Sequence, residues 1–98
     1  MRRLPIALGL GLLLLSAGHA AASQCKPGKK SFELVFEGMP YQVVMGMLGC
    51  LGDLKSSSLV QGQRTEVFEW TGSGKPGAKI SAVFVNDVMV VKSAYGLE

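Results

Sequence analysis

The segment ISAVFVNDVMVVKS, residues 80–93, decides the fold because it contains two β-strand patterns on either side of a two-residue turn. Asn86 and Asp87 occupy that turn, and both residue types tolerate the positive φ angles that a tight hairpin requires. A two-residue turn here places four pairs of residues opposite each other: Val85 with Val88, Phe84 with Met89, Val83 with Val90, and Ala82 with Val91.

This pairing predicts apolar residues on both faces of the hairpin. One face carries Ile80, Ala82, Phe84, Met89 and Val91, and the other carries Val83, Val85, Val88 and Val90. We expect helices to cover the Phe84 face, because its side chains are bulkier. The valine strip then presents about 200–300 Å² of apolar surface and is a candidate partner-binding site. The alternative is that these valines are present only because β-branched residues form strands well.

A further strand is predicted over residues 64–70, RTEVFEW, where Phe68 and Trp70 lie on one side. Trp70 is either an exposed anchor for a partner or a core aromatic residue. The serine-rich segment 52–63 has no periodic pattern and is predicted to be a loop. Residues 71–77, TGSGKPG, are predicted to form a wide hairpin loop.

Two short helices are predicted before the strands. Residues 31–39 place Phe32, Val35 and Phe36 at helical spacing. Residues 40–51 begin with Pro40, which suits a first helical turn, and Gly49 is a stop signal. The apolar stripe expected on this second helix consists of Val44, Met47, Leu48 and Leu51. The sequence therefore predicts an α+β fold, in which two short N-terminal helices pack on one face of a three-stranded antiparallel meander.

Residues 1–22 have the layout of a secretory signal peptide. Arg2 and Arg3 precede an apolar stretch that is followed by small residues, and cleavage is expected after Ala22, or alternatively after Ala20. A flexible linker is expected at residues 23–30 and a single domain at 31–98. Without the leader, the remaining 76 residues carry eight basic and seven acidic side chains, so no basic surface for nucleic acid is expected.

Export to the periplasm or the medium would allow the two cysteines, Cys25 and Cys50, to form a disulfide. Lipidation of Cys25, with anchoring at the outer membrane, is the alternative. Gln24 disfavours it, because a lipoprotein signal has a small residue at that position. The basic residues near Cys25 (CKPGKK) are either a solvated tail or a peripheral contact with phospholipid head groups.

Little in the sequence suggests catalysis. The one histidine, His19, lies in the predicted leader, so nucleophile–histidine pairs and histidine-containing zinc sites are excluded downstream of it. Glu33 and Glu37 are interpreted as parts of a solvated helix face. We therefore expect no enzyme activity, no metal site and no cofactor.

Three stretches together resemble a known group of small exported modules: residues 36–53, residues 67–70, and residues 78–93 with the closing YGL at 95–97. The similarity is to the α-α-β-β-β modules of the β-lactamase-inhibitor-like group, which includes the SmpA/OmlA-type envelope lipoproteins. Its matching positions are Gly38, Met39, Leu48, Gly49, Trp70, Phe84 and Lys92. The resemblance implies protein binding through the sheet face opposite the helices.

The functional expectation is a non-catalytic exported module that binds a protein through Val83, Val85, Val88, Val90 and Trp70. A second copy of the chain is one candidate partner. The alternative is a factor for cell-envelope maintenance or outer-membrane assembly, of the SmpA/OmlA type.

Overall fold

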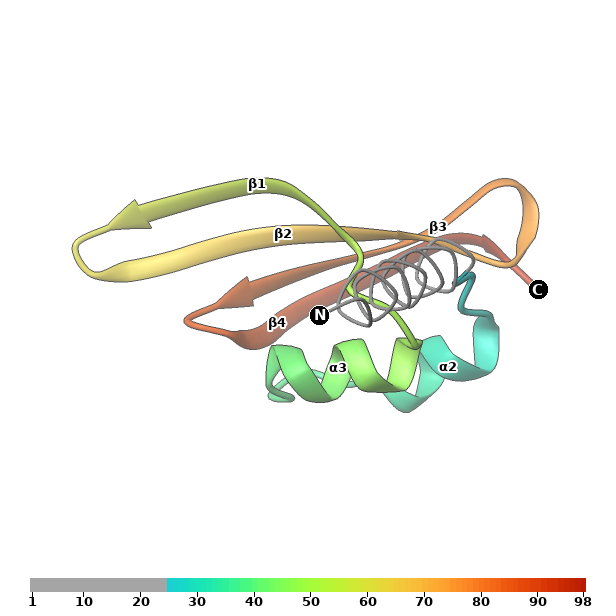
Figure 1. Cartoon of the computed structure of the whole chain (residues 1–98), viewed down its shortest axis with the longest axis horizontal. Helices are drawn as coiled ribbons and strands as arrows, with labels where there is room; N and C mark the ends of the chain where they lie inside the picture. The colour runs from blue at the N-terminus through green and yellow to red at the C-terminus, as the bar shows by residue number, and fades with distance from the viewer. Residues whose placement is uncertain (1–24) are drawn as a thin grey trace, which may run out of the picture.

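The computed structural model describes residues 25–98, which form an α+β fold with two short helices and a four-stranded antiparallel sheet (Figure 1). The predicted signal peptide, residues 1–22, lies outside the described residues. The strands follow one another across the sheet in the order β1-β2-β3-β4. The elements are α2 (Lys29–Leu34), α3 (Tyr41–Leu48), β1 (Asp53–Val60), β2 (Gln63–Thr71), β3 (Gly74–Val85) and β4 (Val88–Leu97).

The hairpin formed by β3 and β4 has the predicted turn. Asn86 and Asp87 have φ angles of 49° and 69°, so both adopt the left-handed conformation that the turn needs. Next to the turn, Val85 pairs with Val88 and Phe84 with Met89, as predicted. The prediction of this hairpin is confirmed.

Farther from the turn the register differs from the prediction, because β4 contains a β-bulge at Val90. Val83 pairs with Val91 instead of Val90, and Ala82 pairs with Lys92 instead of Val91. One extra residue in a strand reverses the facing of every residue beyond it. The assignment of Val91 to the Phe84 face is therefore wrong, and Lys92 takes its place there.

The prediction of three strands is also wrong, since part of segment 52–63 forms β1. This strand pairs with β2, and a two-residue turn at Gln61 and Gly62, with φ angles of 53° and 80°, joins them. Every residue of β1 is exposed. A strand without a buried face needs no alternation of apolar and polar residues, so its sequence resembles a loop. Pairing of its backbone with β2 holds it in place.

The predicted wide loop at 71–77 is likewise shorter in the structure. Only Gly72 and Ser73 connect β2 to β3, and an irregularity in the β3–β4 pairing absorbs the residues between Gly74 and Lys79. The backbone N–H of Ser73 donates to the carbonyl oxygen of Pro27 at 2.9 Å. The N-terminal segment therefore supports this turn.

The first helix begins and ends earlier than predicted. It ends at Leu34, and Val35 is extended, with φ −91° and ψ 144°. Val35 is buried and Phe32 is half-buried, as the predicted stripe requires, but Phe36 is exposed. The extended backbone at Val35 turns Phe36 away from the side it would occupy in a continuous helix.

The second helix is confirmed but is shorter than the predicted 40–51, since it runs from Tyr41 to Leu48. Pro40 is its N-cap, and Gly49 ends it in the left-handed conformation, where its N–H donates to the carbonyl oxygen of Met45 at 2.9 Å. Val44 and Leu48 are buried, whereas Met47 and Leu51 are exposed. Two turns of helix bury only a narrow stripe, and Leu51 lies beyond the helix end.

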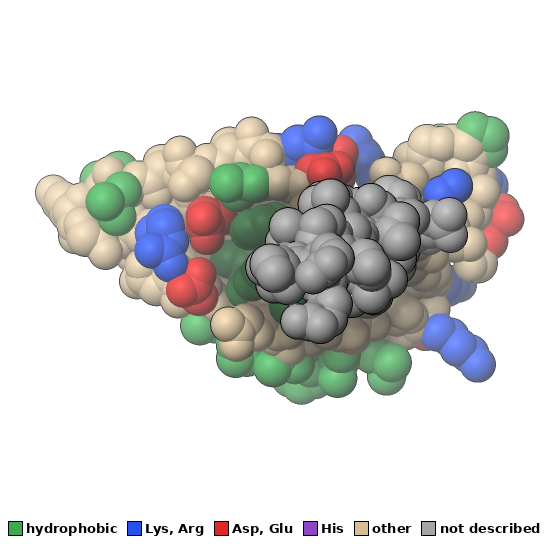
Figure 2. All heavy atoms as spheres, viewed as in Figure 1, with side chains coloured by type: hydrophobic (Ala, Val, Ile, Leu, Met, Phe, Trp, Pro, Cys, Tyr) green, Lys and Arg blue, Asp and Glu red, His purple; other side chains and the backbone are tan. Residues whose placement is uncertain are grey.

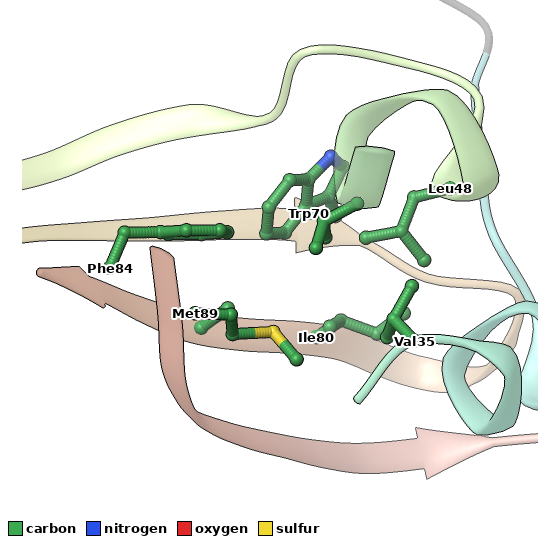
Figure 3. Close-up of a cluster of buried hydrophobic side chains, with 8 residues drawn as sticks. Val35, Leu48, Trp70, Ile80, Phe84 and Met89 are labelled. Atoms are coloured by element: carbon green, nitrogen blue, oxygen red, sulfur yellow. The ribbon is translucent and has the colours of Figure 1, made fainter. Parts of the chain in front are cut away.

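One cluster of buried side chains combines residues from the helical segment with residues from the sheet (Figure 3). Trp70 is 1% exposed, and its indole N–H donates to the carbonyl oxygen of Cys50 at 2.9 Å. Trp70 is therefore a core residue, and its assignment as an exposed partner anchor is corrected. The cluster consists of Val35, Val44, Leu48, Trp70, Ile80, Ala82, Phe84 and Met89.

Cys25 and Cys50 form a disulfide, as predicted. The bond links the segment before α2 to the residue that follows Gly49. It leaves no free thiol at Cys25 for the thioether of a lipoprotein.

The bulge in β4 places Lys92 on the same face of the sheet as Phe84. Its ammonium group donates to the carbonyl oxygens of Phe32 at 2.9 Å and Val35 at 2.8 Å, and it lies 4.2 Å from the centre of the Phe32 ring. These carbonyls lie at the end of α2, where a positive charge is favourable. Lys92 therefore attaches the end of α2 to the sheet.

Replacing Lys92 with methionine is expected to lower the free energy of unfolding by about 2 kcal/mol, because two charge-assisted hydrogen bonds and a cation–π contact are lost. Chemical denaturation measures this change. Lys75→Met is the matched control, since Lys75 is exposed, and it is expected to have little effect. Equal stability of the two variants would contradict the assigned role of Lys92.

Candidate protein-binding site on the open sheet face

The candidate site is the sheet face opposite Phe84, here called the open face. Residues directly opposite each other on paired strands share a face. The register therefore aligns Val67, Val83 and Val91 in one row across β2, β3 and β4, and Val85 with Val88 in the next row. Val90 has no partner in this register, and it joins the open face because it and Val91 together oppose Val83 at the bulge. The open face is defined by Val67, Val83, Val85, Val88, Val90 and Val91.

The valines along β4 are the most accessible part of this face. Val88, Val90 and Val91 are 38%, 42% and 49% exposed. Val83 and Val85, on the neighbouring strand, are half-buried. Of the four valines predicted from the sequence, Val88 and Val90 on the edge strand β4 are therefore exposed, whereas Val83 and Val85 on β3 are half-buried.

Charged side chains border the open face beyond Val67. The carboxylate of Glu69 lies 3.9 Å from the ammonium group of Lys55 and 3.6 Å from that of Lys79. Exposed pairs of this kind each contribute at most about 1 kcal/mol to stability. These charged side chains also form a polar rim beside the valines of the open face, and a polar rim around an apolar centre is a common pattern at protein interfaces.

The Asn86-Asp87 turn is held to β2 by Arg64. Its guanidinium group bonds the carboxylate of Asp87 at 2.8 Å, and its backbone N–H donates to the side-chain oxygen of Asn86 at 2.9 Å. The hydrogen bond and the charge of Asp87 raise the pKa of Arg64 above its usual value. These bonds hold the turn that joins β3 to β4, the two strands that carry most of the valines of the open face.

Tyr41 supports the other side of the sheet. Its ring stacks on Phe68 at 4.6 Å between centroids, and its hydroxyl donates to the carbonyl oxygen of Leu51 at 2.8 Å. Burial raises the pKa of Tyr41, and the negative charge of Glu66 adds to this effect. The hydroxyl therefore stays protonated at neutral pH and acts as a structural donor.

The described residues contain no group of three or more histidine, cysteine or acidic side chains arranged to hold a metal ion. A hollow of about 540 Å³ beside the β2–β3 turn is lined by Lys26, Glu69 and Lys79, among others. Its one carboxylate, that of Glu69, is already paired with two lysines. Within residues 25–98, no helix has the length and apolar character needed to cross a bilayer.

Two residues of the open face were missed by the sequence prediction. Val67 lies on the opposite side of β2 from Phe68 and Trp70, so the predicted strand at 64–70 already implied that Val67 belongs to the open face. Val91 was assigned to the wrong face, because its position depends on the bulge at Val90. No residue type in the hairpin marks that bulge.

Comparison of this chain with protein-family models, curated proteins and solved structures found no match. The resemblance to β-lactamase-inhibitor-like modules therefore stays a hypothesis based on sequence motifs. Function has to follow from the surface chemistry of the chain itself.

Proposed function

We propose that this chain is a non-catalytic, exported module that binds a protein through the open face. The observation that supports the proposal is the collection of six valines on one face, of which the three on β4 are 38–49% exposed. Burying such a strip would contribute several kcal/mol, on the order of 25 cal/mol per Å², before the cost of association.

The shape of the surface favours a protein partner over a small ligand. A small-molecule site is concave and encloses its ligand, whereas the open face is one side of a four-stranded sheet. In this proposal α2 and α3 cover the Phe84 side, and the valine side is left for the partner. The polar rim formed by Lys55, Glu69 and Lys79 would surround the apolar contact on one side.

Export is the second part of the proposal. It is supported by the predicted leader and by the Cys25–Cys50 disulfide, since structural disulfides persist in oxidising compartments. The mass of the natural protein tests it, and an unmodified chain that starts at Ser23 is expected. A diacylglyceryl adduct on Cys25 would instead support the anchored envelope factor.

Changing Val90 to aspartate is expected to leave the fold intact and to weaken partner binding at least about 100-fold, because a carboxylate would be buried in an apolar contact. Val83→Asp is expected to have the same effect on binding. A photo-crosslinking amino acid at position 90, introduced in the producing cell, identifies the partner by mass spectrometry. Calorimetry with that partner then gives the affinities.

Position 59 provides the control. Leu59 is 69% exposed and pairs with Arg64, on the side of the sheet opposite the open face. A crosslinker at 59 is expected to capture no partner, and Leu59→Asp is expected to bind like the natural protein. If Val90→Asp folds and still binds with full affinity, the proposal is wrong. If both valine variants unfold, the open face is part of the protein's own core.

A further inference from the structure

A second apolar surface lies on the outer side of the two helices, away from the open face. Figure 2 shows hydrophobic side chains gathered along the side of the molecule that α3 and α2 form. We call this surface the helix patch. It consists of Leu34, Phe36, Val43 and Met47, which are 59%, 60%, 42% and 42% exposed.

The composition of α3 is unusual for a helix with an exposed side. Its sequence, YQVVMGML, contains no charged residue. Val43 and Met47 are one turn apart and share a face. A surface helix of a monomer normally carries charged side chains on that face. Together the four residues of the patch expose on the order of 400 Å² of apolar surface, which is the size of functional patches on soluble proteins.

The charges beside the patch are separated along the chain. Lys29 and Lys30 lie at the start of α2, while Glu33 and Glu37 follow toward its end and beyond. All four are exposed, and none of them forms an ion pair within residues 25–98. On α2, Lys30 lies one turn from Leu34, so these charged residues lie beside the helix patch.

We propose that the helix patch is the interface of a two-fold symmetric homodimer. A two-fold axis perpendicular to residues 29–37 reverses their direction in the second copy. The lysine end of each copy then faces the glutamate end of the other, and the apolar side chains bury one another. A parallel arrangement would place like charges together.

The acidic residues argue against an anionic bilayer as the alternative occupant. Lysines attract such a surface by about 1 kcal/mol each, but Glu33 and Glu37 would be repelled by it. The homodimer instead uses both signs of charge. Two copies bury roughly 800 Å² of apolar area together with a polar rim, which is near the lower limit for a specific interface, so a Kd of about 1–100 μM is expected.

Sedimentation equilibrium of the natural protein tests this inference, and a monomer–dimer equilibrium is expected in that range. Met47→Asp is expected to weaken the dimer at least about 100-fold, whereas Leu59→Asp, which adds the same charge elsewhere, leaves it unchanged. Met47→Ser serves as a second variant should the aspartate disturb folding. A natural protein that is monomeric throughout, or a folded Met47 variant that dimerises fully, would overturn the proposal.

A charge exchange tests the direction of the two chains. Lys30→Glu and Glu37→Lys are each expected to weaken their own homodimer about tenfold, because like charges then meet. Mixed with each other, the two variants are expected to associate as well as the natural protein, since opposite charges face each other at both ends. Single variants that dimerise as well as the natural protein would contradict the antiparallel direction, and failure of the mixture to associate would contradict the pairing of these charges across the interface. Cosedimentation with phosphatidylglycerol vesicles, abolished by Met47→Asp, would assign the patch to a membrane instead.

Discussion

Replacing Gly52 with alanine is expected to lower the free energy of unfolding by about 3–5 kcal/mol. Gly52 has a φ of +78°, which disfavours any residue with a Cβ, and a Cβ built there lies 2.6 Å from Cε2 of Trp70. The indole is buried and bonded to Cys50, so it has little room to move. Urea denaturation followed by tryptophan fluorescence measures the loss.

Gly62→Ala separates the two causes of this effect. Gly62 has nearly the same φ, +80°, but a Cβ at that position has nothing within 4 Å. Gly62→Ala is therefore expected to lower the free energy of unfolding by only about 1–2 kcal/mol, because only the backbone strain of a Cβ-bearing residue at positive φ remains. If Gly52→Ala were no more destabilising than Gly62→Ala, the close approach of Gly52 to Trp70 would have no energetic consequence.

Replacing both Cys25 and Cys50 with serine is expected to lower the free energy of unfolding by about 3 kcal/mol. The reason is that the unfolded chain regains the conformational entropy that closure of the 25-residue loop by the disulfide had removed. For a chain this short, such a loss is a large part of the total stability. Thermal and urea unfolding, with and without a reducing agent, measure it.

The reductant provides the control for this second prediction. Reduction is expected to lower the stability of the natural protein to that of the double serine variant, and to leave the variant itself unchanged. Alkylation of the unreduced, unfolded protein is expected to label neither cysteine. Labelling of both cysteines would show that the disulfide is absent from the protein in solution.

The hairpin and the second helix were predictable because their signals are local. Asn86 and Asp87 accept the positive φ angles of the turn, and Pro40 and Gly49 favour the start and the end of α3. The disulfide followed from the presence of two cysteines in a chain for which an export signal is predicted. The turn and helix signals act over a few positions, and the disulfide prediction required only that two cysteines were available to pair.

The candidate site was predictable only in part. Val83, Val85 and Val88 lie on the predicted face, since β3 keeps its alternation and the register of β4 holds next to the turn. Beyond Val90 the register depends on the bulge, and this decides on which face Val91 and Lys92 lie. The helix patch had no sequence prediction, because exposure of Phe36 follows from the end of α2 at Leu34.

The sequence by itself determined the α+β order, the apolar character of both hairpin faces, the turn at residues 86–87 and the cysteine pair. The tertiary structure alone decided that β1 is a strand, that Trp70 is buried and that Lys92 reaches the end of α2. The physical reason is the same in each case. β1 depends on backbone bonds to a neighbouring strand, Trp70 on the carbonyl of Cys50, and Lys92 on carbonyls almost sixty residues away, and no local pattern records such partners.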